Sequence, residues 1–403
     1  MGHPPRSSCE PIKFLSGSQY GKILKVSELR HLTGLTRAEL IAFFGEMGEP
    51  RFRADQVFRG LHERRLMSFD EMTDLSKALR EKLKETAEAS TLTVESKYTS
   101  VDGTRRFLMR TANGNPVETV YIPTENRDTI CFSSQSGCAL KCDFCMTAKL
   151  GFLQNLTAGE IIEQIIIVLN DVYGVGNETP HGTNLVAMGE GEPFLNFENL
   201  INALQIMSDE NGLHIVPGRV TVSTAGIVPK IREFAALERR PNLAISLSSA
   251  NDELRDKLMP INKRWPINEL LVAAKAFEKT LKRGERFTFE YVLLGGVNDS
   301  DEQAEELADL LQRHDLRKAK INLIPHNPAE QLDYRPSTPD RVRQFKEVLE
   351  SRGVSAYIRT PRGRDIYAAC GQLAAMDDSK SDAFRRLRDE VLPEETPEGV
   401  TLT

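Results

Sequence analysis

Three cysteines in one short stretch of the 403-residue chain have the spacing of a metal-cluster site. Cys138, Cys142 and Cys145 are arranged as C-x3-C-x2-C, directly after a run expected to form a strand. A cubane iron–sulfur cluster ordinarily takes four cysteine thiolates. Three thiolates leave one iron open, and an open iron can chelate a substrate. The spacing therefore indicates a 4Fe-4S cluster with one free coordination position.

Two plainer interpretations of these cysteines stay open from the residues alone. A zinc site would want a fourth cysteine or a histidine, and the next histidine is His181, well outside the loop. Redox-active thiols are the other interpretation, although a disulfide between two of the three would leave the third unpaired. A secreted disulfide framework does not fit six cysteines in a chain of this length.

Polar residues follow several predicted strands, where the active sites of α/β folds gather. A Gly-Glu-Pro run begins at Gly191 and includes Glu192, and each residue of such a loop is by default part of an ordinary turn. Ser223 ends the next expected strand and Asn327 follows a later one. Their common position at strand ends makes them candidates for binding a ligand.

Strand-like and helical runs alternate from residue 129 onward, which predicts an α/β domain with a parallel sheet, either doubly wound or a barrel. Helices are expected between most of the strands, including 300–313 and 339–351. We assign this core to residues 129–375. The expected strands are 129–132, 184–188, 219–223, 243–247, 288–294, 320–324 and 355–359.

A small helical domain is expected to precede the core, over residues 21–92. Thr36 with Glu39, and Ser68 with Glu71, have the pattern of capping boxes, and helices are expected near 54–65 and 77–88. Several arginines in this domain indicate either a solvated helical face or an RNA-binding surface. Residues 93–128 carry two hairpin signals, Asp-Gly and Asn-Gly, and predict a small antiparallel linker region.

The charge of the chain argues weakly against a nucleic-acid partner, since its formal net charge is −6. Much of the negative charge lies in 376–403, which reads as a flexible acidic tail, and residues 1–20 read as a disordered extension. No apolar run approaches the ~20 residues of a membrane helix. We therefore expect a cytoplasmic protein with no membrane contact.

With Phe144 before the last cysteine, the C-x3-C-x2-C motif resembles the signature of the radical S-adenosylmethionine superfamily. The Gly-Glu-Pro run resembles that superfamily's segment that holds the amino group of the cofactor. The resemblance implies a partial (βα)6 TIM-like barrel and a 4Fe-4S cluster whose open iron binds S-adenosylmethionine. One electron from the cluster then yields a 5′-deoxyadenosyl radical.

A closer resemblance, over most of the chain, is to the RlmN/Cfr group of RNA adenine methyltransferases, and within it to the RlmN branch. It implies formation of C2-methyladenosine at adenosine 2503 of 23S rRNA and at adenosine 37 of tRNAs, with two S-adenosylmethionine molecules per turnover. It also implies a helix-hairpin-helix-like N-terminal domain and an electron donor such as flavodoxin or a reductase system; we expect a monomer. The segments that carry the resemblance are 53–57, 72–76, 117–123, 131–138, 259–263 and 365–373.

The resemblance also assigns roles to single residues. Cys370 would carry a methyl group to the base, Glu118 would accept the proton lost from carbon 2, and Cys131 would attack Cys370 to release the product and leave a transient disulfide. From the residues alone, both cysteines would be buried structural thiols and Glu118 an exposed strand carboxylate. The residues that the resemblance places at the cofactor are Gly191, Glu192, Ser223, Ser246, Leu247, Ser248 and Asn327.

Two positions depart from the family pattern: Glu190 stands where methionine is usual and Ser248 where histidine is common. Two other functions are considered. Methylation of carbon 8, as in the Cfr branch, is one, although that branch typically lacks the intact Gly-Glu-Pro and Val-Tyr-Ile-Pro runs found here. The other is a non-enzymatic RNA-binding protein stabilised by zinc.

Overall fold

The computed structural model describes residues 29–373, except 181, 284, 317–318 and 330. The extension expected over 1–20 and the tail expected over 376–403 therefore lie outside the described residues, as does Cys9. A ten-stranded sheet forms the centre of the molecule, in the order β14-β13-β12-β11-β10-β9-β6-β5-β4-β3. No helix of the described part is both long and apolar enough to cross a membrane.

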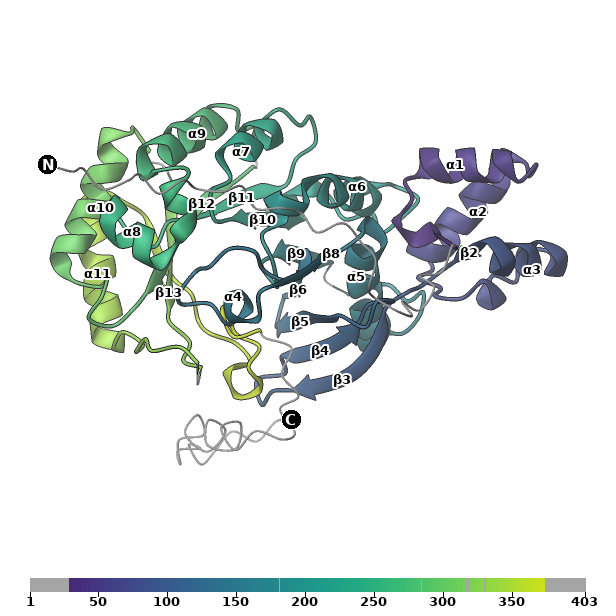
Figure 1. The fold of residues 1–403 in the computed structure, drawn as a ribbon, viewed down its shortest axis with the longest axis horizontal. Coiled ribbons are helices and arrows are strands. Elements are labelled where there is room, and N and C mark those ends of the chain that lie inside the picture. Colours follow the sequence, from purple (N-terminus) through teal and green to yellow (C-terminus); the bar gives the residue numbers. More distant parts are fainter. Residues whose placement is uncertain (1–28, 181, 284, 317–318, 330, 374–403) are drawn as a thin grey trace, which may run out of the picture.

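Seven strands of this sheet run parallel, and helices follow each of the first six, as a partial barrel requires. The sheet does not close on itself within the described residues, since β14 and β3 stand at its two edges (Figure 1). This confirms the predicted α/β core. The parallel strands are β6 (Arg127–Phe132), β9 (Thr183–Ala187), β10 (Val220–Thr224), β11 (Asn242–Ser246), β12 (Phe287–Leu293), β13 (Lys320–Pro325) and β14 (Ala356–Ile358).

Helices cover the outer face of the parallel strands (Figure 1). Two of the predicted boundaries, 300–313 and 339–351, agree with the structure within one residue. The helices are α5 (Ala158–Tyr173), α6 (Phe197–Ser208), α7 (Val228–Ala235), α8 (Asp252–Leu258), α9 (Ile267–Lys279), α10 (Asp301–Arg313) and α11 (Pro339–Ser351), with the short helix α4 (Met146–Leu150) beside the cysteine loop.

The antiparallel strands β3 (Thr93–Thr99), β4 (Arg105–Arg110) and β5 (Pro116–Thr124) continue the same sheet, because β5 pairs with β6. Both hairpins turn at a glycine with positive φ, as the Asp-Gly and Asn-Gly signals predict: Gly103 has φ 82° and Gly114 has φ 78°. Val120 lies opposite Cys131 in the β5–β6 register. This extension therefore brings β5 directly beside the strand that leads into the cysteine loop.

The N-terminal helices are α1 (Arg37–Glu46), α2 (Arg51–His62) and α3 (Lys77–Thr86). Both predicted capping boxes are present, and the second begins a 3-10 turn. The third helix ends before Glu88 because Ala87–Glu88 (β2) pair with Arg30–His31 (β1). The remaining short elements are β7 (Gln135–Gly137), β8 (Phe152–Asn155), η1 (Leu32–Gly34), η2 (Phe69–Glu71), η3 (Pro193–Asn196), η4 (Pro217–Arg219), η5 (Pro260–Lys263) and η6 (Arg364–Ile366).

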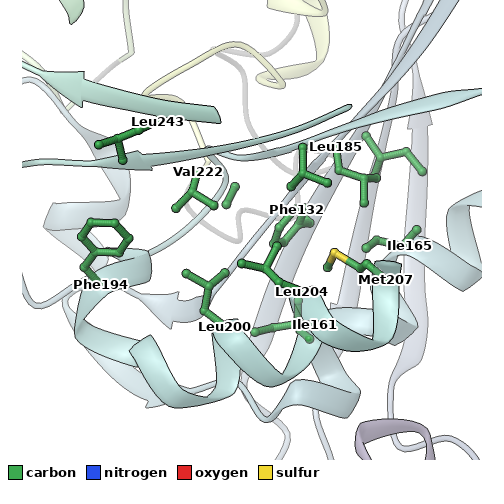
Figure 2. Packing of buried hydrophobic residues seen from close by; sticks show 14 of the residues in the cluster. Phe132, Ile161, Ile165, Leu185, Phe194, Leu200, Leu204, Met207, Val222 and Leu243 are labelled. Atoms are coloured by element: carbon green, nitrogen blue, oxygen red, sulfur yellow. The ribbon is translucent and has the colours of Figure 1, made fainter. Parts of the chain in front are cut away.

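The main core lies between the strands and the covering helices. Apolar side chains of α5 and α6 point toward the sheet, where they meet side chains of β6, β9, β10 and β11 (Figure 2). Fully burying each such side chain contributes roughly 1.5–3 kcal/mol. The labelled core residues are Phe132, Ile161, Ile165, Leu185, Phe194, Leu200, Leu204, Met207, Val222 and Leu243.

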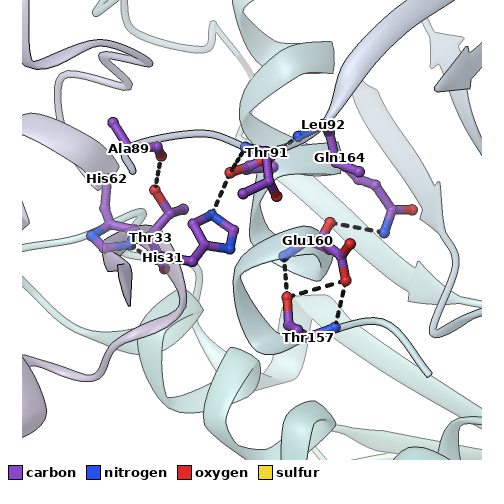
Figure 3. Close-up of polar contacts among 10 residues, drawn as sticks. His31, Thr33, His62, Ala89, Thr91, Leu92, Thr157, Glu160 and Gln164 are labelled. Carbon is purple, nitrogen blue, oxygen red and sulfur yellow. Dashed lines mark hydrogen bonds and ion pairs between the residues drawn. The ribbon is translucent and has the colours of Figure 1, made fainter. Parts of the chain in front are cut away.

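A buried ion pair joins the N-terminal helical domain to the core. His31 Nε2 lies 2.5 Å from Glu163 Oε1 on α5, and the backbone N–H groups of Thr91 and Leu92 also donate to the Glu163 carboxylate (Figure 3). Burial opposes a charge on His31, but its hydrogen bond and attraction to Glu163 outweigh that effect and raise its pKa. Gly159 allows this close approach, since a Cβ there would lie 2.2 Å from the His31 ring.

We expect Glu163→Ala to lower the free energy of unfolding by about 3–5 kcal/mol, because it leaves His31 and two buried backbone N–H groups without an acceptor. Denaturant unfolding measures this loss. Glu160→Gln is the matched control, since glutamine at that position preserves the capping box with Thr157. Equal stabilities of the two variants would show that the ion pair does not hold the domain in place.

Candidate functional site

A pocket with an empty volume of about 1040 Å³ opens at the carboxyl ends of the parallel strands. Its wall contains all three cysteines of the predicted cluster motif, together with Cys370 from the end of the described chain. The structure therefore brings residues more than 200 positions apart in the sequence into one site.

The cysteine loop is fixed at its start and in its middle. Gly137 has φ 68°, and a Cβ there would lie 1.8 Å from the carbonyl oxygen of Gly151, so only glycine fits. The backbone N–H of Cys138 donates to that same carbonyl over 2.9 Å. In the middle of the loop, the Asp143 backbone N–H donates to Leu258 O over 3.0 Å. These contacts hold the three thiols toward the pocket.

The chemistry of the three thiols fits a cationic group in this pocket. Burial raises the pKa of Cys138 to about 12, and burial with the neighbouring cysteines raises the pKa of Cys142 well above its usual value. Thiolates therefore form here only with a strong positive partner, which the irons of a cluster supply. A site for a single metal ion is a different case: within the described residues, no three His, Cys, Asp or Glu side chains lie close enough together to bind one such ion.

The Gly-Glu-Pro loop forms a second, rigid part of the wall. Glu192 Oε2 accepts the N–H of Ala225 over 2.7 Å and Oε1 accepts that of Phe194 over 3.0 Å. Burial raises the pKa of Glu192 to about 7. Gly191 has φ 93°, and a Cβ there would meet the Gln135 side chain at 2.5 Å. The loop thus presents a buried carboxyl group with a fixed orientation.

The predicted cofactor residues divide into two groups in the structure. Five line the pocket: Gly191, Glu192, Ser223, Ser246 and Asn327. The other two, Leu247 and Ser248, are fully buried and lie outside the pocket wall. The Leu247 side chain packs in the main core, and Ser248 Oγ accepts the backbone N–H of Val292. Direct contact with a ligand is thus available to the first group.

Sequence reasoning missed Arg255, which supports the loops of the pocket wall by hydrogen bonds. Its guanidinium is fully buried and donates to the carbonyls of Leu247, Ser246 and Ala225 and to Asn262 Oδ1. Burial lowers its pKa to about 10. One side chain therefore ties together the loops that follow β10 and β11. The Met-Pro-Ile-Asn-Lys segment, which contains Asn262, was the signal that could have pointed to it.

The segment that carries Cys370 is anchored on the cysteine loop. Gly371 O accepts the backbone N–H of Met146 over 2.8 Å, and Leu373 O accepts the Thr147 hydroxyl over 2.8 Å. Asn327 Nδ2 also donates to the carbonyl of Cys370 over 3.2 Å. The Cys370 residue is exposed and lines the pocket. Loss of water around its thiol raises the pKa of Cys370. Cys370 thus faces the site that the three clustered thiols line.

Cys131 lies next to this segment, as a reaction between the two cysteines requires. It is 8% exposed and packs in a small apolar cluster with Val120 and with Ile366 and Ala368 of the C-terminal segment. Burial raises its pKa, and the nearby Cys370 raises it further. Both cysteines are free thiols. The structure therefore brings together the two residues that the sequence assigned to one reaction.

Glu118 is fully buried, so the interpretation of this residue as an exposed strand carboxylate is wrong. The error arises because β5 lies inside the sheet between β4 and β6, a placement set by long-range pairing. Arg106 Nη1 donates to Glu118 Oε1 over 2.8 Å. Glu118 lies outside the pocket wall, but on the same face of the sheet as Val120 and hence as Cys131.

We expect Arg255→Lys to lower the free energy of unfolding by about 2–4 kcal/mol and to weaken binding of S-adenosylhomocysteine, because an ammonium cannot reach all four acceptors. Denaturant unfolding and equilibrium dialysis measure the two effects. Arg240→Lys is the matched control, since the buried Arg240 also donates to two carbonyls, at the opposite end of β11. Equal ligand binding in both variants would contradict the bracing role.

Two family models match the chain. The model of the ribosomal RNA large subunit methyltransferase N-terminal domain matches residues 30–89. The model of the radical SAM superfamily matches residues 132–311, which contain the three clustered cysteines.

Known proteins are similar over most of their length. The probable dual-specificity RNA methyltransferase RlmN of Koribacter versatilis is 46% identical over 343 residues, covering 81% of this chain and 96% of the relative. The dual-specificity RNA methyltransferase RlmN of Marinobacter nauticus is 45% identical over 360 residues, covering 89% and 96%. The crystal structure of a radical SAM methyltransferase from Sphaerobacter thermophilus matches with a TM-score of 0.82 and 40% identity, covering 86% of this chain and all of that one. With the cysteine pocket on the sheet of this fold, these similarities show that the chain belongs to the RlmN family of radical SAM methyltransferases.

Proposed function

We propose that this enzyme methylates carbon 2 of adenine in RNA, at adenosine 2503 of 23S rRNA and adenosine 37 of tRNAs. The observation that carries the proposal is the arrangement of five thiols: Cys370 faces the pocket of the three clustered cysteines, and Cys131 lies behind it. The relatives named dual-specificity RNA methyltransferases support an RNA substrate. We expect a cytoplasmic monomer that draws electrons from flavodoxin or a reductase system.

The pocket fits the cofactors that this chemistry needs. Cys138, Cys142 and Cys145 would hold a 4Fe-4S cluster, and Glu192 is placed to accept the amino group of S-adenosylmethionine. When bound, these groups supply a methyl group and a 5′-deoxyadenosyl radical. Ser223, Ser246 and Asn327 offer hydroxyl and amide groups along the same wall.

A carrier thiol is required because carbon 2 of adenine is electron-poor and does not attack a methyl donor. Cys370 supplies the nucleophile, since a thiolate is nucleophilic even toward a sulfonium methyl group. Its anchoring by Asn327 and Met146 holds the sulfur over the pocket while the base enters. The base must be unstacked to enter the pocket, and its extrusion costs a few kcal/mol.

Product release uses the second cysteine. Glu118 accepts the proton that leaves carbon 2, and the Cys131 thiolate attacks the sulfur of Cys370. The sulfur–carbon bond to the base breaks, its electron pair together with a proton from the solvent completes the new methyl group, and a disulfide forms that an external reductant must open. The packing of Cys131 against the segment of Cys370 suits this step, since disulfide partners need Cα atoms within roughly 7 Å.

We expect Cys370→Ala to abolish RNA methylation, because no other thiol of the described chain faces the pocket outside the cluster motif. We expect Cys131→Ala to accumulate a covalent protein–RNA adduct, because the sulfur–carbon bond can no longer be broken. Anaerobic reactions, gel analysis of the adduct and mass spectrometry of digested RNA measure both effects.

Methylated RNA released by Cys131→Ala at the normal rate would contradict the role of Cys131. In the digest, 8-methyladenosine in place of 2-methyladenosine would overturn the proposed position. A colourless anaerobic preparation that carries zinc and no iron would overturn the radical chemistry altogether.

A further inference from the structure

Glu290 on β12 lines the pocket but has no part in the reaction proposed above. Strand β12 alternates between two faces of the sheet. Glu290 and Val292 line the pocket, whereas Phe289 and Tyr291 pack in the main core. Glu290 is only 5% exposed, so its carboxyl group belongs to the pocket wall and not to the outer surface. A buried carboxyl group in such a place needs polar partners.

One oxygen of this carboxyl group has its partners within the protein. Glu290 Oε1 accepts the Thr288 hydroxyl over 2.9 Å and the side-chain N–H of Asn322 over 2.7 Å. Thr288 lies two residues earlier on β12, and Asn322 is the partner of Glu290 in the β12–β13 register. Because both donors stand on strands of the sheet, they hold the carboxyl group in one orientation.

The second oxygen is available to a ligand. Within the described residues, Glu290 Oε2 accepts no hydrogen bond, and it is not one of the polar atoms that are closed off from solvent without a partner. The residue is otherwise buried and lines the pocket, so this oxygen faces the pocket space. A carboxylate oxygen only accepts hydrogen bonds. Glu290 thus presents one fixed acceptor to whatever binds there.

A hydroxyl group stands beside this acceptor. Ser246, at the end of β11, is the partner of Glu290 in the β11–β12 register, and it also lines the pocket. Neighbouring strands lie about 4.8 Å apart. A serine hydroxyl can donate a hydrogen bond as well as accept one. The two strands therefore offer an acceptor and a donor side by side.

An acceptor next to a donor matches one edge of an adenine ring. The amino group on carbon 6 donates, and the ring nitrogen beside it accepts. A purine with oxygen on carbon 6 would instead set its own acceptor against the Glu290 carboxylate. Only one carboxylate oxygen is free, which suits a single amino group better than the paired hydroxyl groups of a ribose.

We infer that Glu290 is a specificity-determining residue: its free oxygen accepts the amino group of an adenine ring in the pocket, while Ser246 donates to the adjacent ring nitrogen. Two adenines belong to the reaction, that of S-adenosylmethionine and the target base of the RNA. The inference rests on the proposed function for the second of these sources and is independent of it for the first.

The test exchanges the acceptor for a donor while the side chain stays in place. In Glu290→Gln the amide oxygen keeps the position of Oε1, because Thr288 and Asn322 both donate to it. The amide NH2 then takes the position of the free oxygen. The variant therefore keeps its internal hydrogen bonds, and it should favour a purine with oxygen on carbon 6 over adenine.

The first arm of the test measures the cofactor. Equilibrium dialysis of the anaerobically prepared, cluster-loaded full chain compares S-adenosylhomocysteine with S-inosylhomocysteine, which carries oxygen in place of the amino group. If Glu290 binds the cofactor, the parent should favour the adenine compound by about 10- to 100-fold, and Glu290→Gln should lose or reverse this preference. Burial raises the pKa of Glu290, so the measurement is made at pH 8, where the carboxylate is ionised.

The second arm measures the target base. With saturating S-adenosylhomocysteine, the same proteins are titrated with an RNA hairpin that has either adenosine or inosine at the target position. If Glu290 binds the base, the parent should favour the adenosine hairpin by about tenfold or more, and Glu290→Gln should not. A preference for adenine in either arm that Glu290→Gln removes supports the inference and identifies which adenine is bound.

Glu160→Gln is the matched control, since Glu160 is a glutamate with the same exposed fraction outside the pocket wall. It should bind both pairs of ligands as the parent does. Equal preferences of the parent and Glu290→Gln in both arms would overturn the inference, and so would a parent that does not distinguish the two purines in either arm.

Two further measurements keep the outcome clear. If Glu290→Gln does not fold, Thr288→Val replaces it: loss of one donor to Oε1 should weaken the preference for adenine, and an unchanged preference would overturn the inference. The cofactor arm needs no turnover. A parent that selects S-adenosylhomocysteine but methylates no RNA would therefore refute the proposed function alone, whereas RNA methylation without any purine preference would refute the inference alone.

Discussion

The site depends on the contact between the end of the described chain and the cysteine loop. Gly371 and Leu373 accept hydrogen bonds from Met146 and Thr147, at the start of the helix that follows the last clustered cysteine. Without these bonds the C-terminal segment would have only its apolar contacts, around Ile366 and Ala368, to hold it against the sheet. Because the loop of the three clustered cysteines also anchors the segment of Cys370, Cys370 keeps a fixed position relative to those cysteines.

A second constraint is the supply of positive charge in a buried site. The thiols, and carboxyl groups such as Glu192 and Glu190, have raised pKa values because burial removes water and few cations are near. Arg255 and Arg106 are both buried, but carbonyl oxygens and Glu118 already occupy them. The thiols of Cys138 and Cys142 therefore keep their protons until a cationic group enters the pocket. The buried thiols of the pocket therefore favour a ligand that carries positive charge.

Much of the fold could be predicted because its signals are local. Strand runs, capping boxes such as that of Thr36 and Glu39, and the hairpin glycines depend on neighbouring residues, and the structure confirms them. The burial of Glu118 could not be predicted, since it depends on β5 lying between two other strands. Arg255 was missed for the same reason: three of its four acceptors are backbone carbonyls of distant loops, which leave no trace in residue types.

The residues of the pocket wall are separate from the reactive groups behind it, so the site has two regions. The wall holds the cluster thiols, Glu192 and Cys370, where ligands bind. Behind it lie Cys131 and Glu118, on the face of the sheet that the C-terminal segment covers. The C-terminal segment is the element that joins the two regions, since it carries Cys370 on one side and packs on Cys131 with the other.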